Sequence, residues 1–120
     1  MISPFAVILK STVDATPHAI GGAFADSEGE MVDSYAKIDA HEWAVLTAHY
    51  GVVLALLTAA FGTLHFGGPE YFIAHHRKIE VIVHTVDDGY FALLAFREPP
   101  PEDVMDRLRA CTLALREEMR

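Results

Sequence analysis

The chain has 120 residues, and 9 Lys and Arg against 17 Asp and Glu give it a formal net charge of −8. This length suits one domain over residues 1–120, and 52% hydrophobic against 22% charged residues exclude a disordered chain. The acidic balance argues against nucleic acid and against an anionic membrane surface as partners, because both are bound by clustered Lys and Arg.

The N-terminal third predicts one helix and one hairpin. Residues 4–16 place an apolar stripe on one side of a helix that starts near Pro4 and stops at Pro17. Residues 18–26 and 31–36 alternate as strands on either side of an acidic turn at Gly29, which predicts a β-hairpin. The helix stripe consists of Phe5, Ile8, Leu9, Thr12 and Val13.

A long helix is predicted from Asp39, a plausible N-cap with Glu42 three residues later, to about Phe61. One apolar stripe of this helix is expected to face the sheet, and it consists of Trp43, Leu46, Tyr50, Val53, Leu54, Leu57 and Phe61. A second stripe consists of Val45, Val52, Leu56 and Ala59. A helix on a small sheet buries only one side, so the second stripe needs another cover, and a second subunit is the simplest.

The C-terminal half predicts three strands and a helix. Residues 70–77, 79–86 and 90–96 read as strands, with turns at Arg77-Lys78 and at Asp87–Gly89. The last helix opens after three prolines, with Glu102 and Asp103 expected in its first turn. Its apolar stripe consists of Val104, Leu108, Cys111 and Leu115.

These elements predict an α/β fold of the α+β sandwich type, built on one five-stranded antiparallel sheet. Hairpins join strand 1 to 2, 3 to 4 and 4 to 5. Placing strand 5 beside strand 1 gives the order 2-1-5-4-3, with the most apolar strand in the centre. The long helix then covers one face, and the two terminal helices cover the other. Strands 2 and 3 become edges, which invite pairing.

The sequence also bears on the compartment. A single cysteine, Cys111, cannot form an internal disulfide, and the apolar stretch Phe5–Leu9 is shorter than the core of a secretory signal. The 27 residues from Trp43 to Pro69 carry no Asp, Glu, Lys or Arg, and such a run could span a membrane. Its histidines, threonines, glycines and proline favour a buried helix instead. We expect a cytoplasmic protein with no membrane partner.

The sequence gives little sign of catalysis. It contains neither a Gly-rich phosphate loop nor a G-x-S-x-G turn. His41 and His49 are eight residues apart on a helix, and the adjacent His75 and His76 point to opposite faces of a strand, so neither pair chelates. A site shared between two chains through His75 or His76 remains an alternative. We expect no enzyme activity, no cofactor and no metal.

Two segments carry a resemblance to a known family. Residues 18–29 form a small-residue strand that runs into an acidic Gly turn, and residues 79–94 form an apolar hairpin that ends in a Leu-rich strand. Both are similar to segments of the Roadblock/LC7 family, whose bacterial members include MglB-like proteins. The resemblance extends over nearly the whole chain, and its patterns are structural, not catalytic.

The resemblance implies a homodimer or heterodimer built on the long helix and the strand after it. It further implies a bacterial adaptor that binds or regulates a small Ras-like GTPase, or that scaffolds a signalling complex. Together with the second stripe it predicts an interface of Val45, His49, Val52, Leu56, Ala59, Tyr71, Phe72, Ile73 and His75. The alternative is a small-molecule sensor module on a profilin-like α/β sandwich, because such sheets also carry ligand pockets.

Overall fold

A computed structural model describes residues 3–87 and 89–120 of the protein. Its elements are α1 (Pro4–Ala15), β1 (Ala19–Ala25), β2 (Met31–Ala36), α2 (Ala40–Phe61), β3 (Tyr71–His75), β4 (Glu80–Thr85), β5 (Phe91–Phe96) and α3 (Val104–Glu118). The strands form one antiparallel sheet in the order β2-β1-β5-β4-β3. The predicted order is therefore confirmed. The turn expected at residues 87–89 includes Asp88, which lies outside the described residues.

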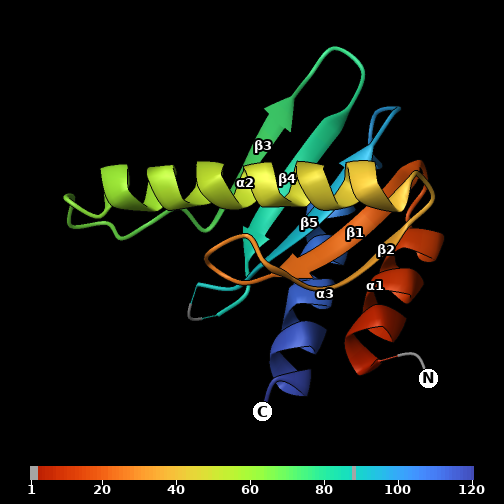
Figure 1. The fold of residues 1–120 in the computed structure, drawn as a ribbon, viewed down its shortest axis with the longest axis horizontal. Helices are drawn as coiled ribbons and strands as arrows, with labels where there is room; N and C mark the ends of the chain where they lie inside the picture. Colours follow the sequence, from red (N-terminus) through yellow and green to blue (C-terminus); the bar gives the residue numbers. More distant parts are fainter. Residues whose placement is uncertain (1–2, 88) are drawn as a thin grey trace.

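The sheet separates two apolar cores, as the α+β sandwich predicts. Figure 1 shows α2 crossing one face, with α1 and α3 packed on the other. All six residues of β5 are buried, because this central strand has a strand on each side and a helix layer over each face. The predicted stripes of α1 and α3 point into one core, where Leu9, Val13, Leu108 and Leu115 are fully buried.

The ends of the two terminal helices follow from capping. Ser3 caps α1 by accepting a hydrogen bond from the backbone N–H of Ala6 at 3.1 Å. Helix α3 begins at Val104, so Glu102 and Asp103 precede the helix instead of forming its first turn. The acidic residue in that first turn is Asp106, which suits the positive end of the helix dipole.

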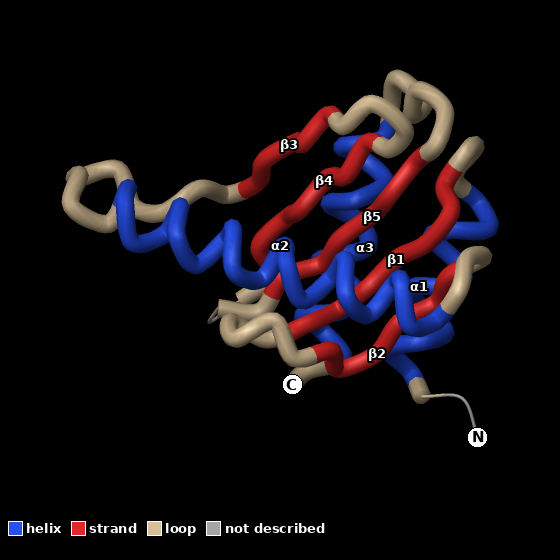
Figure 2. Tube along the Cα trace, turned by 45° about the horizontal axis from the view of Figure 1, so that its top comes forward, coloured by secondary structure: helices blue, strands red, loops and turns tan. Residues whose placement is uncertain are grey.

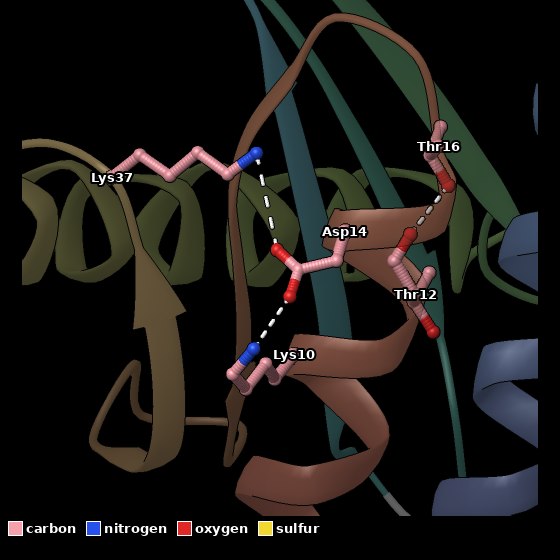
Figure 3. Close-up of polar contacts among 5 residues, drawn as sticks. All are labelled: Lys10, Thr12, Asp14, Thr16 and Lys37. Atoms are coloured by element: carbon pink, nitrogen blue, oxygen red, sulfur yellow. Dashed lines mark hydrogen bonds and ion pairs between the residues drawn. The ribbon is translucent and has the colours of Figure 1, made fainter.

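Asp14 ties α1 to the segment that connects β2 with α2 (Figure 3). Its carboxylate accepts a hydrogen bond from Lys10 Nζ at 2.6 Å, and Lys37 Nζ lies 3.9 Å away. The hydrogen bond from Lys10 is the largest cause that lowers the pKa of the Asp14 carboxyl. At the C-cap of α1, two residues after Asp14, Thr16 Oγ1 donates to the carbonyl of Thr12 at 2.6 Å.

Helix α2 begins as predicted, because the Asp39 side chain accepts a hydrogen bond from the N–H of Glu42 at 3.0 Å. Its buried residues are Trp43, Thr47, Tyr50, Gly51 and Leu54. The hydroxyl of the buried Thr47 is hydrogen-bonded, since its Oγ1 donates to the carbonyl of Trp43 at 2.9 Å. The sheet-facing side of α2 therefore includes polar and small residues, which a prediction based on the spacing of apolar residues does not include.

The far end of α2 has no sheet beneath it. Figure 2 shows the helix crossing the strands and projecting past β3, the edge of the sheet. Val53 and Phe61 were predicted to face the sheet, but they are 38% and 42% exposed. Phe61 lies in the projecting end, and Val53 lies on the flank of α2 beside β3. By length and composition α2 could cross a membrane, and here its buried side packs on the sheet.

Candidate interface on helix α2 and strand β3

The second apolar stripe of α2 lies on the side of the helix away from the sheet. Its members Val52 and Leu56 are 57% and 66% exposed, and Val45, His49 and Ala59 are exposed as well. The steps between these five positions alternate between four and three residues, which keeps them on one side of a helix. An exposed stripe of this kind is the pattern that a second helix covers.

Strand β3 presents a free edge beside this helix. The N–H of Thr85 donates to the carbonyl of Glu70, and the N–H of His76 donates to the carbonyl of Ile79. Along an antiparallel pair, the backbone N–H and C=O groups of successive residues point alternately towards the paired strand and away from it. In this stretch, the N–H and C=O groups of the even-numbered residues therefore point towards β4. The backbone groups of Tyr71, Ile73 and His75 therefore point away from the sheet, and no described strand pairs with them.

The side chains of β3 divide between the two faces of the sheet. Phe72 and Ala74 pack into the core under α2 and are half-buried. Tyr71, Ile73 and His75 are exposed on the opposite face, where Ile73 pairs with the buried Ile82 of β4. The nine predicted interface residues thus lie on the outer side of α2 and on both faces of β3.

A groove of about 840 Å³ runs between α2 and β3. Its walls are apolar, with Val45, Leu46, Val53, Phe72 and Ala74 among the lining residues. The groove adjoins both the outer stripe of α2 and the free edge of β3. A large apolar hollow that opens onto an unpaired strand is a surface suited to burial against another molecule.

The groove also contains a polar pair. The hydroxyl of Tyr50 is hydrogen-bonded to Nε2 of His76, and both residues line the groove. Burial raises the pKa of the Tyr50 hydroxyl, so the phenol keeps its proton at neutral pH and can donate it to His76. The sequence analysis missed this pair, because the two residues are 26 positions apart and no local pattern joins them.

The loop after α2 continues the exposed apolar surface. Leu64 and Phe66 are 49% and 89% exposed, in a segment that returns from the projecting end of α2 towards β3. Figure 1 shows this loop at the far end of α2, beyond the sheet. Phe66 is the most exposed of the large hydrophobic residues in the described part of the chain.

Groups that could perform chemistry are dispersed. Burial raises the pKa of the Cys111 thiol, which favours the protonated and unreactive form. His75 pairs with Glu80 at 2.9 Å, and His18 pairs with Glu98 at 2.7 Å. Among residues 3–87 and 89–120, no group of three or more His, Cys, Asp or Glu side chains is placed to hold a metal ion.

Comparison with solved structures identifies the fold. A Roadblock/LC7 domain from Streptomyces avermitilis has a TM-score of 0.84 at 11% identity, covering 94% of this chain and 95% of that chain. MglB of Myxococcus xanthus has a TM-score of 0.86 at 10% identity, covering 98% and 96%. An MglB with a tetrameric arrangement has a TM-score of 0.84 at 17% identity, covering 98% and 90%.

These likenesses lie in the fold, since the identities are low. No protein-family model matches the sequence, and no curated protein matches it. The resemblance to Roadblock/LC7 and MglB-like proteins, which the sequence carried in residues 18–29 and 79–94, is confirmed as a shared architecture over nearly the whole chain.

Proposed function

From the fold of Roadblock/LC7 domains and MglB, we propose that this chain is a cytoplasmic, non-enzymatic homodimeric member of that family. Its role is that of an adaptor or regulator, which binds a small Ras-like GTPase or scaffolds a signalling complex in a bacterium. The dimer forms through α2 and β3, and it uses the nine residues named above.

One observation carries the proposal: α2 is apolar on the side that its own sheet does not cover. Val45, Val52 and Leu56 are 42%, 57% and 66% exposed and would each leave water in the dimer, and each would contribute roughly half of the about 1.5–3 kcal/mol that full burial of such a side chain gives. The adjacent edge of β3 offers unpaired backbone groups as well. One partner that covers both features satisfies the apolar surface and the backbone together.

The outer stripe of α2 is complementary to itself. In a dimer joined at the β3 edges, both copies of α2 lie on one face of the combined sheet and run antiparallel side by side, so the residues of the stripe nearest the partner helix meet their own counterparts. No Asp, Glu, Lys or Arg occurs in the stripe, so this packing brings no like charges together. One of the similar solved structures is an MglB with a tetrameric arrangement, and its self-association is consistent with a homodimer of this chain.

Sedimentation of the purified protein tests the dimer. Across a range of concentrations we expect a species of twice the chain mass of 13.2 kDa. A species of the chain mass at every concentration would contradict the homodimer.

Binding to GTPases tests the partner. Immobilised protein should retain a Ras-like GTPase, and it should retain one nucleotide state, GTP or GDP, more than the other. A GTPase regulated through its switch loops has a different surface in each state, which is the physical basis of such a preference. Equal or absent retention of every GTPase tried would leave the scaffold role alone.

The groove favours a second candidate, the small-molecule sensor. Its volume of about 840 Å³ and its apolar lining are in the range of ligand sites. Native mass spectrometry of the protein as purified would show a retained ligand as added mass. In the dimer the groove adjoins the second copy, so we favour protein as the molecule that covers it.

A further inference from the structure

We propose that a small basic hollow at one end of the sheet binds an acidic segment of a partner protein, whose carboxylates pair with Arg77, Lys78 and Arg97. The hollow lies between the β3–β4 hairpin and the segment that follows β5, and its volume is about 260 Å³. The inference goes beyond the proposed dimer and its GTPase partner, because the hollow belongs to a single chain and lies apart from the outer stripe of α2.

The strand register brings the two walls of the hollow together. Glu80, the first residue of β4, lies across from His75 of β3 on one side and from Phe96 of β5 on the other. The hairpin after His75 and the chain after Phe96 therefore leave the sheet at the same end, as Figure 1 shows. Two segments that are far apart in the sequence thus form one hollow.

The cations of the hollow face solvent. Arg77 and Lys78 in the hairpin and Arg97 after β5 line it, and all three residues are exposed. Among residues 3–87 and 89–120, no carboxylate lies within ion-pair distance of these three side chains. Arginine presents a planar pair of N–H groups that matches the two oxygens of a carboxylate. The three side chains therefore offer donors for an acidic ligand.

Both carboxylates that line the hollow are paired with histidines. Nδ1 of His75 lies 2.9 Å from the carboxylate of Glu80, and Nδ1 of His18 lies 2.7 Å from that of Glu98. His18 directly precedes β1, and its φ of 69° is left-handed, which is uncommon for a residue other than glycine. These contacts direct the two acidic side chains towards histidines, so they do not neutralise the cations.

The charge of the hollow is opposite to that of the chain. Its lining has three Lys and Arg against two Asp and Glu, whereas the whole chain has 9 against 17. An acidic partner is therefore repelled by most of the surface and attracted to this end of the sheet. Charge of this kind selects a partner and orients it during the encounter.

The hollow also has an apolar part, which bears on the kind of ligand. Ile79, Phe96 and Pro99 line it together with the charged residues. A peptide segment can place an apolar side chain there and acidic side chains on the cations, whereas a phosphate ion has no apolar part. Clusters of arginine recognise acidic motifs in other protein modules. We therefore favour an acidic peptide segment over a small inorganic anion.

Peptide binding tests the ligand class. A fluorescently labelled Glu-Glu-Leu-Glu-Glu peptide is titrated with the full chain at low salt, and fluorescence polarisation reports the complex. We expect the matched Gln-Gln-Leu-Gln-Gln peptide to bind about tenfold more weakly, and we expect added salt to weaken the acidic peptide selectively. Equal affinities for the two peptides, or no binding of the acidic one, would overturn the proposal.

Charge reversal tests the location. The double variant Arg77→Glu/Arg97→Glu should bind the acidic peptide about tenfold more weakly than the wild type, because two attractive pairs become repulsive. Arg109→Glu/Arg120→Glu is the matched control, with the same net charge and two exposed positions of the C-terminal segment outside the hollow. It should keep most of the affinity, and both variants should have the circular dichroism spectrum of the wild type. An equal loss in the two double variants would show a response to net charge alone and overturn the site.

Two further measurements separate this proposal from its alternatives. Displacement of the peptide by inorganic phosphate, at a concentration at which acetate has no effect, would identify a phosphate site and overturn the acidic segment. Leu56→Glu, which we expect to be monomeric, should bind the peptide as tightly as the wild type. Loss of binding in that variant would place the site between two copies and overturn the proposal. Peptide binding by a wild type that sediments as a monomer would support the hollow and overturn only the homodimer.

Discussion

Gly51 lies in the middle of α2, where a glycine weakens a helix, yet the packing requires it. A Cβ atom at this position would lie 2.5 Å from the Cα of Gly29, the turn glycine that has a φ of +80°. Alanine would gain at most about 1 kcal/mol of helix propensity. The overlap is with backbone, which cannot rotate away as a side chain does, so the steric cost exceeds that gain.

We therefore predict that Gly51→Ala lowers the free energy of unfolding by about 1 kcal/mol or more. Urea denaturation followed by circular dichroism measures this change. Gly68→Ala is the control, because the nearest atom to a Cβ there would be Cγ2 of Thr58 at 3.5 Å, an ordinary van der Waals contact. A Gly51→Ala protein as stable as the wild type would show that α2 does not approach the β1–β2 turn this closely.

Asp14 predicts a dependence of stability on pH. Lys10 holds the pKa of the Asp14 carboxyl below its ordinary value of 3.8, so the ionised form stabilises the folded chain above that pH. This contribution is lost as the pH falls through the lowered pKa of the folded state. Asp14→Asn should melt at a lower temperature than the wild type at pH 7, and the difference should shrink towards about pH 2. A difference that stays constant over this range would contradict the role of the carboxylate.

At the scale of elements, α2 shows what a helical pattern predicts and what it leaves open. Its start at Asp39, its length and its second apolar stripe all followed from the sequence. The side that faces the sheet did not follow in full, because Thr47 and Gly51 are buried while Val53 and Phe61 are exposed. A stripe records which side is apolar, but the sheet beneath decides how far along the helix that side is covered.

Leu56→Glu tests the outer stripe of α2. The side chain is 66% exposed in the single chain, so the substitution should leave the fold intact and place a charge inside the proposed interface. We expect sedimentation at the chain mass with an unchanged circular dichroism spectrum. Ala44→Glu, on an exposed flank of α2 outside the stripe, is the control and should remain dimeric. An unchanged dimer in Leu56→Glu would place the interface elsewhere.

Strand β1 shows a similar limit in the sheet. Strict alternation along β1 would put Ile20 and Phe24 on the same face of the sheet, yet Ile20 packs with the core under α2 and Phe24 packs in the other core. A shift in the register of β1 with β5 between Ala19 and Gly21 breaks the alternation. Such an irregularity depends on the neighbouring strand, so the sequence of β1 alone does not reveal it.

At the scale of the whole molecule, the proposed dimer links stability to concentration. Association stabilises the folded state by mass action. If only folded chains associate, a hundredfold rise in protein concentration stabilises the folded dimer by about 2.7 kcal/mol. We predict that the melting temperature of the wild type rises by several degrees over such a range, as differential scanning calorimetry can measure. The melting temperature of Leu56→Glu should not change with concentration. A wild-type melting temperature that is independent of concentration would contradict the dimer.

The sequence by itself determined the eight elements, the strand order and the apolar outer stripe of α2, because capping residues, periodicity and hairpin turns act over short distances. It also carried the resemblance that the solved structures confirm as a fold. Only the tertiary structure decided where α2 crosses the sheet and projects past it, how the groove forms beside β3, and that Tyr50 meets His76. These features depend on the distance and angle between elements far apart in the chain, which packing fixes and no local pattern encodes.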